Sequence, residues 1–251
     1  SNSHGFFASS LAVAFYFAGA VLLAHMLTNG RYGYFRDELY FLACGEHLAW
    51  GFVDCAPLIA LVAWLSRTLF GDSLHAIRFF PAVASAATVL LTGLIARELG
   101  GKRFAVALAC LCMLVPPVNH VIGTLLTMNV FEPLFWMGCA YCTLLVIKRD
   151  NPKYFLWFGV LAGLGLENKH SLLFFGFALI LGLLLTRDRR FFADKWIWIA
   201  GVIAIVIFLP NLIWQYQHNW PTLEVLSNVK RMHKNVELPP LPFLGQQIAM
   251  M

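Results

Sequence analysis

Residues Phe6 to Leu27 read FFASSLAVAFYFAGAVLLAHML and contain no Asp, Glu, Lys or Arg. At about 1.5 Å per residue, a helix of this length crosses the roughly 30 Å hydrocarbon core of a bilayer. The remaining chain has the same character, because 60% of all 251 residues are hydrophobic, 12% are charged and the mean hydropathy is +0.72. Soluble domains carry about 25% charged residues. The composition therefore predicts an all-α polytopic membrane protein.

The first apolar run could instead be a removable signal peptide. That interpretation is disfavoured, because no basic segment precedes the run, no Ala-x-Ala-like site follows it, and further apolar runs come after it. Six of these later runs are predicted to cross the membrane: Phe79 to Ala96, Phe104 to Val118, Val130 to Ile147, Tyr154 to Leu166, Ser171 to Leu185 and Trp196 to Tyr216. The shorter run from Pro57 to Phe70 fits an interfacial or re-entrant helix better than a span. We therefore expect about seven transmembrane helices.

The distribution of basic residues predicts which loops are cytoplasmic. Loops 97–103, 148–153 and 187–195 hold ten of the 18 Lys and Arg residues within 22 positions. This bias marks the cytoplasmic side, and the three loops share a side only if residues 57–70 do not cross. Residues 31–56 are then expected outside. The pI near 9.0 reflects this topology, and no nucleic-acid partner is expected.

A polar tetrad, Glu167-Asn168-Lys169-His170, interrupts the otherwise apolar segment 154–185. We predict two short helices that meet at this tetrad, close to the outer head groups. Ionisable groups at such depth usually face a wet cavity or one another. The alternative is a Glu167–Lys169 pair that extends to the surface, and the sequence leaves both open. Gly159, Gly163 and Gly165 lie within an apolar helix and predict close helix packing rather than a phosphate-binding loop.

The outer segment 31–56 carries six charged residues, including Arg36-Asp37-Glu38, and is the expected place for chemistry in so apolar a chain. Its two cysteines, Cys44 and Cys55, are chemically able to form a disulfide in an oxidising compartment, although the sequence does not establish one. The remaining cysteines are predicted to be small apolar packing residues within spans: Cys110, Cys112, Cys139 and Cys142.

Four stretches of this sequence resemble a known enzyme family. YFRDELY (34–40), followed by HLAWGFVD (47–54) and Pro57-Leu58, resembles the first outer loop of bacterial membrane glycosyltransferases of the protein O-mannosyltransferase and aminoarabinose-transferase type, which have the GT-C fold. Three later stretches resemble the family's successive signatures in the same order: TMNVFEPLFW (127–136), GLGLENKHS (163–171) and LPNLIWQYQHNWPT (209–222).

The resemblance implies an integral-membrane glycosyltransferase of the bacterial inner membrane. Such an enzyme takes a sugar from a polyprenyl-phosphate carrier on the periplasmic side and delivers it to an acceptor that the sequence does not identify. The expected organisation is one module over residues 1–251, with 31–78 as the outer catalytic loop and the C-terminal part of the family lacking. The donor and the surrounding bilayer are the partners this implies.

The resemblance assigns the catalytic carboxylate to Asp37, with Glu38 beside it in the catalytic pair. A carboxylate within hydrogen-bonding reach can take the proton of an acceptor hydroxyl as that hydroxyl attacks the sugar. The candidate substrate-binding residues are Arg36, His47, Asp54, Asn129, Glu132, Lys169 and His170. Lys169 is the first candidate for the carrier phosphate, because an ammonium group donates to phosphate oxygens.

Several of these assignments have simpler alternatives. Arg36 can neutralise Asp37 without touching a substrate. The order Asn129 then Glu132 fits a helix N-cap with an acid in the first turn, which we favour over a sugar contact. Relatives commonly have two prolines where this chain has only Pro57, so the orientation of Asp54 is less constrained.

No metal-ligand set or resident cofactor is predicted from the sequence. A divalent cation is possible at Glu46-His47 and Asp54, where oxygen and nitrogen ligands occur, but such loop residues are more often solvated. Two rival functions stay open: a small-molecule or lipid transporter, which usually shows an internal repeat that is not visible here, and a non-catalytic fragment or membrane subunit.

Overall fold

The computed structural model describes residues 9–232 and 238–250, which form helices and connecting segments. Four helical stretches are long and apolar enough to cross a membrane: α2 (Ser10–Thr28), Leu74–Glu98, which comprises α5 (Leu74–Ile77) and α6 (Phe79–Glu98), α9 (Met128–Arg149) and α12 (Lys195–Gln217). The chain is therefore a multi-pass membrane protein. Residues 6–8 of the first predicted span lie outside the described residues.

A fifth candidate span is broken. Helix α7 (Arg103–Leu114) and helix α8 (Pro117–Gly123) meet at an angle of 70°. Pro117 disfavours a helical backbone at Pro116, which is extended with φ −66° and ψ 122°. The prediction of one continuous helix from Phe104 to Val118 is therefore wrong.

The segment 154–185 divides at the polar tetrad, as predicted. Helix α10 (Phe155–Asn168) has 14 residues and helix α11 (Leu172–Leu184) has 13, and the backbone is extended at Lys169 between them. Both helices are too short to count as spans by length. Length and composition thus support four spans, or five with the bent pair, and the predicted seven are not shown.

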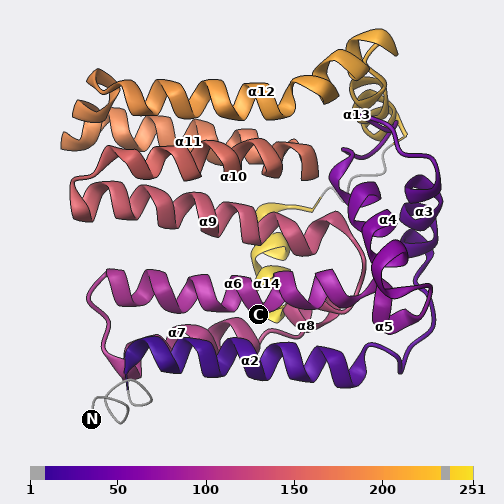
Figure 1. The fold of residues 1–251 in the computed structure, drawn as a ribbon, viewed down its shortest axis with the longest axis horizontal. Coiled ribbons are helices and arrows are strands. Elements are labelled where there is room, and N and C mark those ends of the chain that lie inside the picture. Colours follow the sequence, from indigo (N-terminus) through magenta and orange to yellow (C-terminus); the bar gives the residue numbers. More distant parts are fainter. Residues whose placement is uncertain (1–8, 233–237, 251) are drawn as a thin grey trace.

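The long helices pack side by side in one row, with α6 between α2 and α9, and α10 between α9 and α12 (Figure 1). Glycines allow the close approach in the second half of this row. A Cβ added at Gly159 would lie 2.5 Å from the backbone oxygen of Ala200, and one at Gly163 would lie 2.7 Å from Cβ of Ile207. The prediction that these glycines serve helix packing is confirmed.

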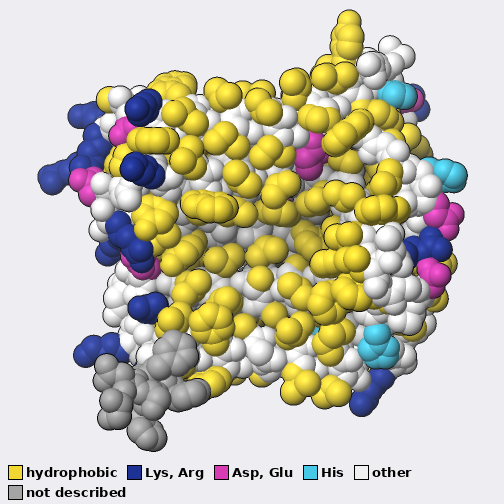
Figure 2. All heavy atoms as spheres, viewed as in Figure 1, with side chains coloured by type: hydrophobic (Ala, Val, Ile, Leu, Met, Phe, Trp, Pro, Cys, Tyr) yellow, Lys and Arg dark blue, Asp and Glu magenta, His cyan; other side chains and the backbone are white. Residues whose placement is uncertain are grey.

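The three basic loops lie at one end of the bundle, where Lys and Arg side chains gather at the left of Figure 2. Ion pairs join the loops to one another. Arg149 contacts Glu98 at 3.1 Å, and Arg190 contacts Asp150 at 2.8 Å. The prediction that the three loops share one side of the molecule is therefore confirmed.

The outer segment forms the opposite end of the bundle. Helix α3 (Arg36–Glu46) and helix α4 (Leu58–Phe70) lie across the right-hand ends of the long helices in Figure 1. Phe41 and Ile59 from these two helices belong to one buried cluster with Phe131 and Phe135 of α9, which fixes the segment on the bundle. Shorter elements complete the described chain: η1 (Pro152–Tyr154), η2 (Arg187–Ala193), α13 (Pro221–Arg231) and α14 (Pro240–Met250).

The cysteines are free thiols in this structure. Cys44 and Cys55 are both buried in the outer segment and no disulfide joins them. Burial is the main reason that the pKa of the Cys55 thiol is raised, and the neighbouring Asp54 raises it further. Of the four cysteines predicted to pack within spans, Cys110, Cys139 and Cys142 are buried, whereas Cys112 is exposed on α7.

Candidate functional site

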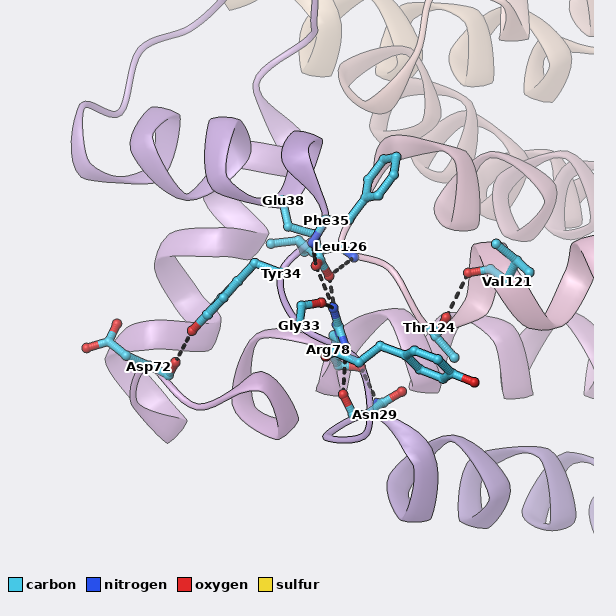
Figure 3. Close-up of polar contacts among 11 residues, drawn as sticks. Asn29, Gly33, Tyr34, Phe35, Glu38, Asp72, Arg78, Val121, Thr124 and Leu126 are labelled. Atoms are coloured by element: carbon cyan, nitrogen blue, oxygen red, sulfur yellow. Dashed lines mark hydrogen bonds and ion pairs between the residues drawn. The ribbon is translucent and has the colours of Figure 1, made fainter.

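A buried ion pair between Glu38 and Arg78 anchors the outer segment (Figure 3). Nε and Nη2 of Arg78 donate to the two carboxylate oxygens of Glu38 at 2.8 and 2.7 Å. The two side chains are 0% and 1% exposed. Arg78 also donates to three backbone carbonyls of the chain between α2 and α3: those of Asn29, Tyr32 and Gly33. The guanidinium therefore holds the connection between α2 and α3 in one shape.

Glu38 also binds two backbone amides. Its Oε2 accepts from the N–H of Phe35 at 2.8 Å, which caps the N-terminus of α3. Its Oε1 accepts from the N–H of Leu126 at 3.0 Å, just before α9. This carboxylate therefore ties the start of α3 to the start of α9.

Asp37 occupies the first turn of α3, immediately before this anchor. Its side chain is 43% exposed, in contrast to the fully buried Glu38. Oδ1 of Asp37 accepts from Nε of Arg36 at 3.0 Å, and Arg36 itself is 88% exposed. Asp37 is therefore a partly accessible carboxylate on a rigidly held helix end, while Arg36 lies in the position expected of a neutralising partner.

Asp54 and His47 lie elsewhere in the outer segment. Oδ1 of Asp54 accepts from the hydroxyl of Tyr40, one turn after Asp37, at 2.5 Å. Burial, and then the hydrogen bond to Asp54, raise the pKa of Tyr40, so its hydroxyl stays a donor at neutral pH. His47 is exposed at the C-terminal end of α3, so the length of the helix, roughly 15 Å at about 1.5 Å per residue, separates it from Asp37.

Lys169 of the tetrad forms hydrogen bonds with polar side chains of α9. Its Nζ donates to Oδ1 of Asn129 at 3.0 Å and to Oε2 of Glu132 at 2.7 Å. The hydroxyl of Ser171 donates to the other oxygen of Glu132, and Asn168 donates to the carbonyl of Met128 at 2.9 Å. We call Asn129, Glu132, Lys169 and Ser171 the Lys169 cluster.

This arrangement corrects two expectations. Thr127 is the N-cap residue of α9, so Asn129 lies within the helix and does not cap it. Lys169 pairs with Glu132 and not with Glu167, because the chain leaves the helix at Lys169 and turns its side chain toward α9. The surface-reaching Glu167–Lys169 pair, left open by the sequence, is therefore not formed.

His170 faces the other neighbour of α10. Its Nε2 lies 3.2 Å from Oδ1 of Asn211 on α12, and Nδ2 of Asn211 donates to the carbonyl of Trp50 at 2.8 Å. The ring of His170 also packs edge-on against Phe208. The tetrad therefore binds α9 on one side and, through the fully buried Asn211, the outer segment on the other.

The predicted site residues lie at one end of the bundle. One group is Asp37 and Glu38 on α3 together with the Lys169 cluster, and the other is His170 with the part of the outer segment that it reaches through Asn211. Leu126, which binds Glu38, precedes Asn129 of the Lys169 cluster by three residues, so the helix that carries Asp37 and the Lys169 cluster are fixed to the same short segment of chain. His170 connects to the opposite part of the outer segment through Asn211. Of the predicted site residues, His47 is the one that lies at the far end of α3 from Asp37.

Sequence reasoning missed two residues that organise the site, Arg78 and Asn211. A signal existed for Arg78, since it is the only residue among Asp, Glu, Lys and Arg between Asp72 and Arg97, and a lone charge beside an apolar run demands a partner. For Asn211 the signal is its place in the stretch 209–222 that resembles a family signature, although the predicted span Trp196 to Tyr216 gave no reason to assign it a role.

The described residues contain no group of three or more His, Cys, Asp or Glu side chains arranged to hold a metal ion. Glu46, one of the predicted cation ligands, instead pairs with Arg67 at 2.6 Å.

Comparison with known proteins identifies a family to which this chain is similar. Residues 54–214, more than half of the chain, match the model of the family described as dolichyl-phosphate-mannose-protein mannosyltransferase. The matched range includes the whole Lys169 cluster, His170 and Asp54, and it begins after Asp37 and Glu38. Searches of curated proteins and of solved structures gave no significant match.

Proposed function

Because the chain belongs to the dolichyl-phosphate-mannose-protein mannosyltransferase family, we propose that it transfers a sugar from a polyprenyl-phosphate carrier to an acceptor, with Asp37 as general base. Family membership supports the class of donor and the class of reaction. The geometry at the N-terminus of α3 supports the assignment of the base.

The transfer exchanges one bond for another at the anomeric carbon of the sugar. Asp37 takes the proton of the acceptor hydroxyl while the oxygen attacks the anomeric carbon, and the bond from that carbon to the carrier phosphate breaks. The products are the glycosylated acceptor and the polyprenyl phosphate. General-base catalysis of this kind typically contributes 10²–10⁴-fold to the rate.

Asp37 and Glu38 have different roles in this proposal. Asp37 is the partner for the substrate, because it is partly exposed and it forms an ion pair with the exposed Arg36. Glu38 is the positioning member, because Arg78 and two backbone amides already occupy its oxygens. The observation that carries the proposal is this contrast between a buried, saturated carboxylate and its accessible neighbour.

Lys169 is the proposed contact of the carrier phosphate. An ammonium group has three N–H donors, and Asn129 and Glu132 take two of them. The third can donate to a phosphate oxygen, and the charge stabilises the phosphate as it leaves. Asn129, Glu132 and His170 then serve to place the sugar and the ammonium group, and Arg36 is a second donor for the phosphate.

The proposed topology places this end of the bundle outside the cytoplasm. Ten basic residues occupy the three loops at the other end, and the positive-inside rule assigns that end to the cytoplasm. The proposal retains seven crossings, in which α10, α11 and the bent pair of α7 and α8 each cross once. The periplasmic face of a bacterial inner membrane is the proposed location.

Substitution of Asp37 tests the proposal. Membranes that contain Asp37→Asn should transfer radiolabelled sugar from polyprenyl-phosphate mannose about 10²–10⁴-fold more slowly than membranes with the native chain. Asp72→Asn is the matched control, because Asp72 is an exposed carboxylate of the same loop 31–78 and contacts Arg67. Native-like transfer by Asp37→Asn excludes Asp37 as the base. If the native chain itself transfers no sugar, the non-catalytic alternative is favoured.

A further inference from the structure

A cavity of about 390 Å³ lies between the outer segment and α4 on one side and helices α10 and α12 on the other. Trp50 lines it from the outer segment, Leu58 and Leu61 line it from α4, and Leu164, Glu167 and Ile207 line it from the bundle. We call it the Trp50 pocket. All the residues that line it are apolar except Glu167.

Glu167 is buried without a hydrogen-bond partner. The residue is 6% exposed, and neither carboxylate oxygen has a partner among the described residues. The backbone N–H of Asn211 is close enough to interact with it but does not meet hydrogen-bonding geometry. Buried polar groups in proteins are nearly always satisfied, and each exception calls for an explanation. A ligand that brings donors to this carboxylate supplies one.

The lining of the pocket favours a ligand with a primary ammonium group. An unpaired carboxylate in apolar surroundings gains most from a positive charge that also carries N–H donors. Trp50 adds an aromatic ring, which attracts cations. No Lys or Arg residue is among those that line the pocket, so a ligand that also carries a phosphate would place its ammonium group at Glu167 and its phosphate at the mouth of the pocket.

The surroundings of the pocket favour a lipid over a soluble amine. Trp50 and Leu61 are 63% and 45% exposed, which gives the pocket an apolar mouth at one end of the bundle. Glu167 is the second-last residue of the short helix α10, at the end of the bundle that carries the outer segment. At the end of a membrane-spanning bundle, lipid head groups lie beside the helix ends, and the acyl chains can pack against the aliphatic side chains of the pocket.

We infer that the Trp50 pocket binds a phospholipid through its primary ammonium head group, with Glu167 as the acceptor. The inference does not rest on the proposed transfer reaction. The pocket adjoins the C-terminal end of α3, whereas Asp37 lies at the N-terminal end, so the two sites are tested separately.

Native mass spectrometry of the full chain in detergent tests this inference. Phosphatidylethanolamine and phosphatidylcholine with identical acyl chains are supplied together, since both have zero net charge but only the first has N–H donors. The native protein should retain phosphatidylethanolamine about tenfold over phosphatidylcholine, because one charge-assisted hydrogen bond accounts for about that ratio. Glu167→Gln should reduce the ratio to near one. The control Glu46→Gln alters an exposed carboxylate of the outer segment and should leave the ratio unchanged.

A second variant covers the case in which Glu167→Gln does not fold. Leu61→Trp fills the pocket without changing the carboxylate, and it should also abolish the preference. Equal retention of the two lipids by the native protein overturns the inference, as does a preference that survives both substitutions. Displacement of the lipid by soluble glycerophosphoethanolamine at equal concentration shows that a free amine is the occupant, and this overturns the assignment to a lipid.

Discussion

Replacement of Arg78 by Met should be among the most destabilising single substitutions in this protein. The guanidinium makes two hydrogen bonds to Glu38 and three to backbone carbonyls, all in a site where the two side chains are 0% and 1% exposed. Arg78→Met leaves the Glu38 carboxylate buried and without its counter-charge. Breaking a buried ion pair in this way costs about 3–5 kcal/mol.

The expected loss can be measured as a change in thermal stability. For a chain of this size, about 2–4 °C of Tm corresponds to each kcal/mol, so Arg78→Met should lower the apparent Tm in detergent by roughly 6–20 °C. Arg67→Met is the matched control. Arg67 also contacts two carboxylates, Glu46 at 2.6 Å and Asp72 at 2.5 Å, but its side chain is 33% exposed. Exposed pairs contribute about 0–1 kcal/mol each, so the loss of these two pairs should lower Tm by roughly 8 °C at most.

A double substitution separates the charge from the other contacts. Glu38→Leu combined with Arg78→Met removes the uncompensated carboxylate, so the pair should be less harmful than the sum of the single changes. Recovery should be partial, because the backbone groups that the two side chains bind remain unpaired. The reasoning is refuted if Arg78→Met lowers Tm no more than Arg67→Met does, or if the two single losses add without coupling.

Two further predictions follow from helix packing and from the topology. Gly159→Ala should lower the free energy of unfolding by about 1–3 kcal/mol, because the new Cβ would lie 2.5 Å from the backbone oxygen of Ala200. Gly176→Ala, with nothing within 4 Å of the new Cβ, should be neutral or slightly stabilising, and equal effects of the two substitutions would contradict the packing. The topology is tested with single cysteines in a background without native cysteines. In intact cells, an impermeant maleimide should label Tyr32→Cys directly and should label Lys153→Cys only after permeabilisation. The reverse result would place residues 31–56 in the cytoplasm.

The sequence by itself determined the class and most helix positions. Apolar composition over runs such as Phe79 to Ala96 requires a membrane environment, and the structure has α6 at Phe79–Glu98. The break at Glu167–His170 was also predictable, because a polar tetrad cannot lie in lipid within one overlong helix. The end of α7 at Leu114 was not predicted, although Pro116-Pro117 is a pair of helix-breaking residues within the predicted span from Phe104 to Val118.

Only the tertiary structure decided what the charged residues do. Asp37 and Glu38 are adjacent acids in the sequence, yet one is partly exposed and the other is saturated by Arg78, which lies 40 positions away along the chain. The partner of Lys169 is Glu132 rather than the nearby Glu167, which is left facing a pocket. The physical reason is that composition fixes which segments enter the bilayer, whereas the pairing of buried charges depends on which helices become neighbours after they have entered it.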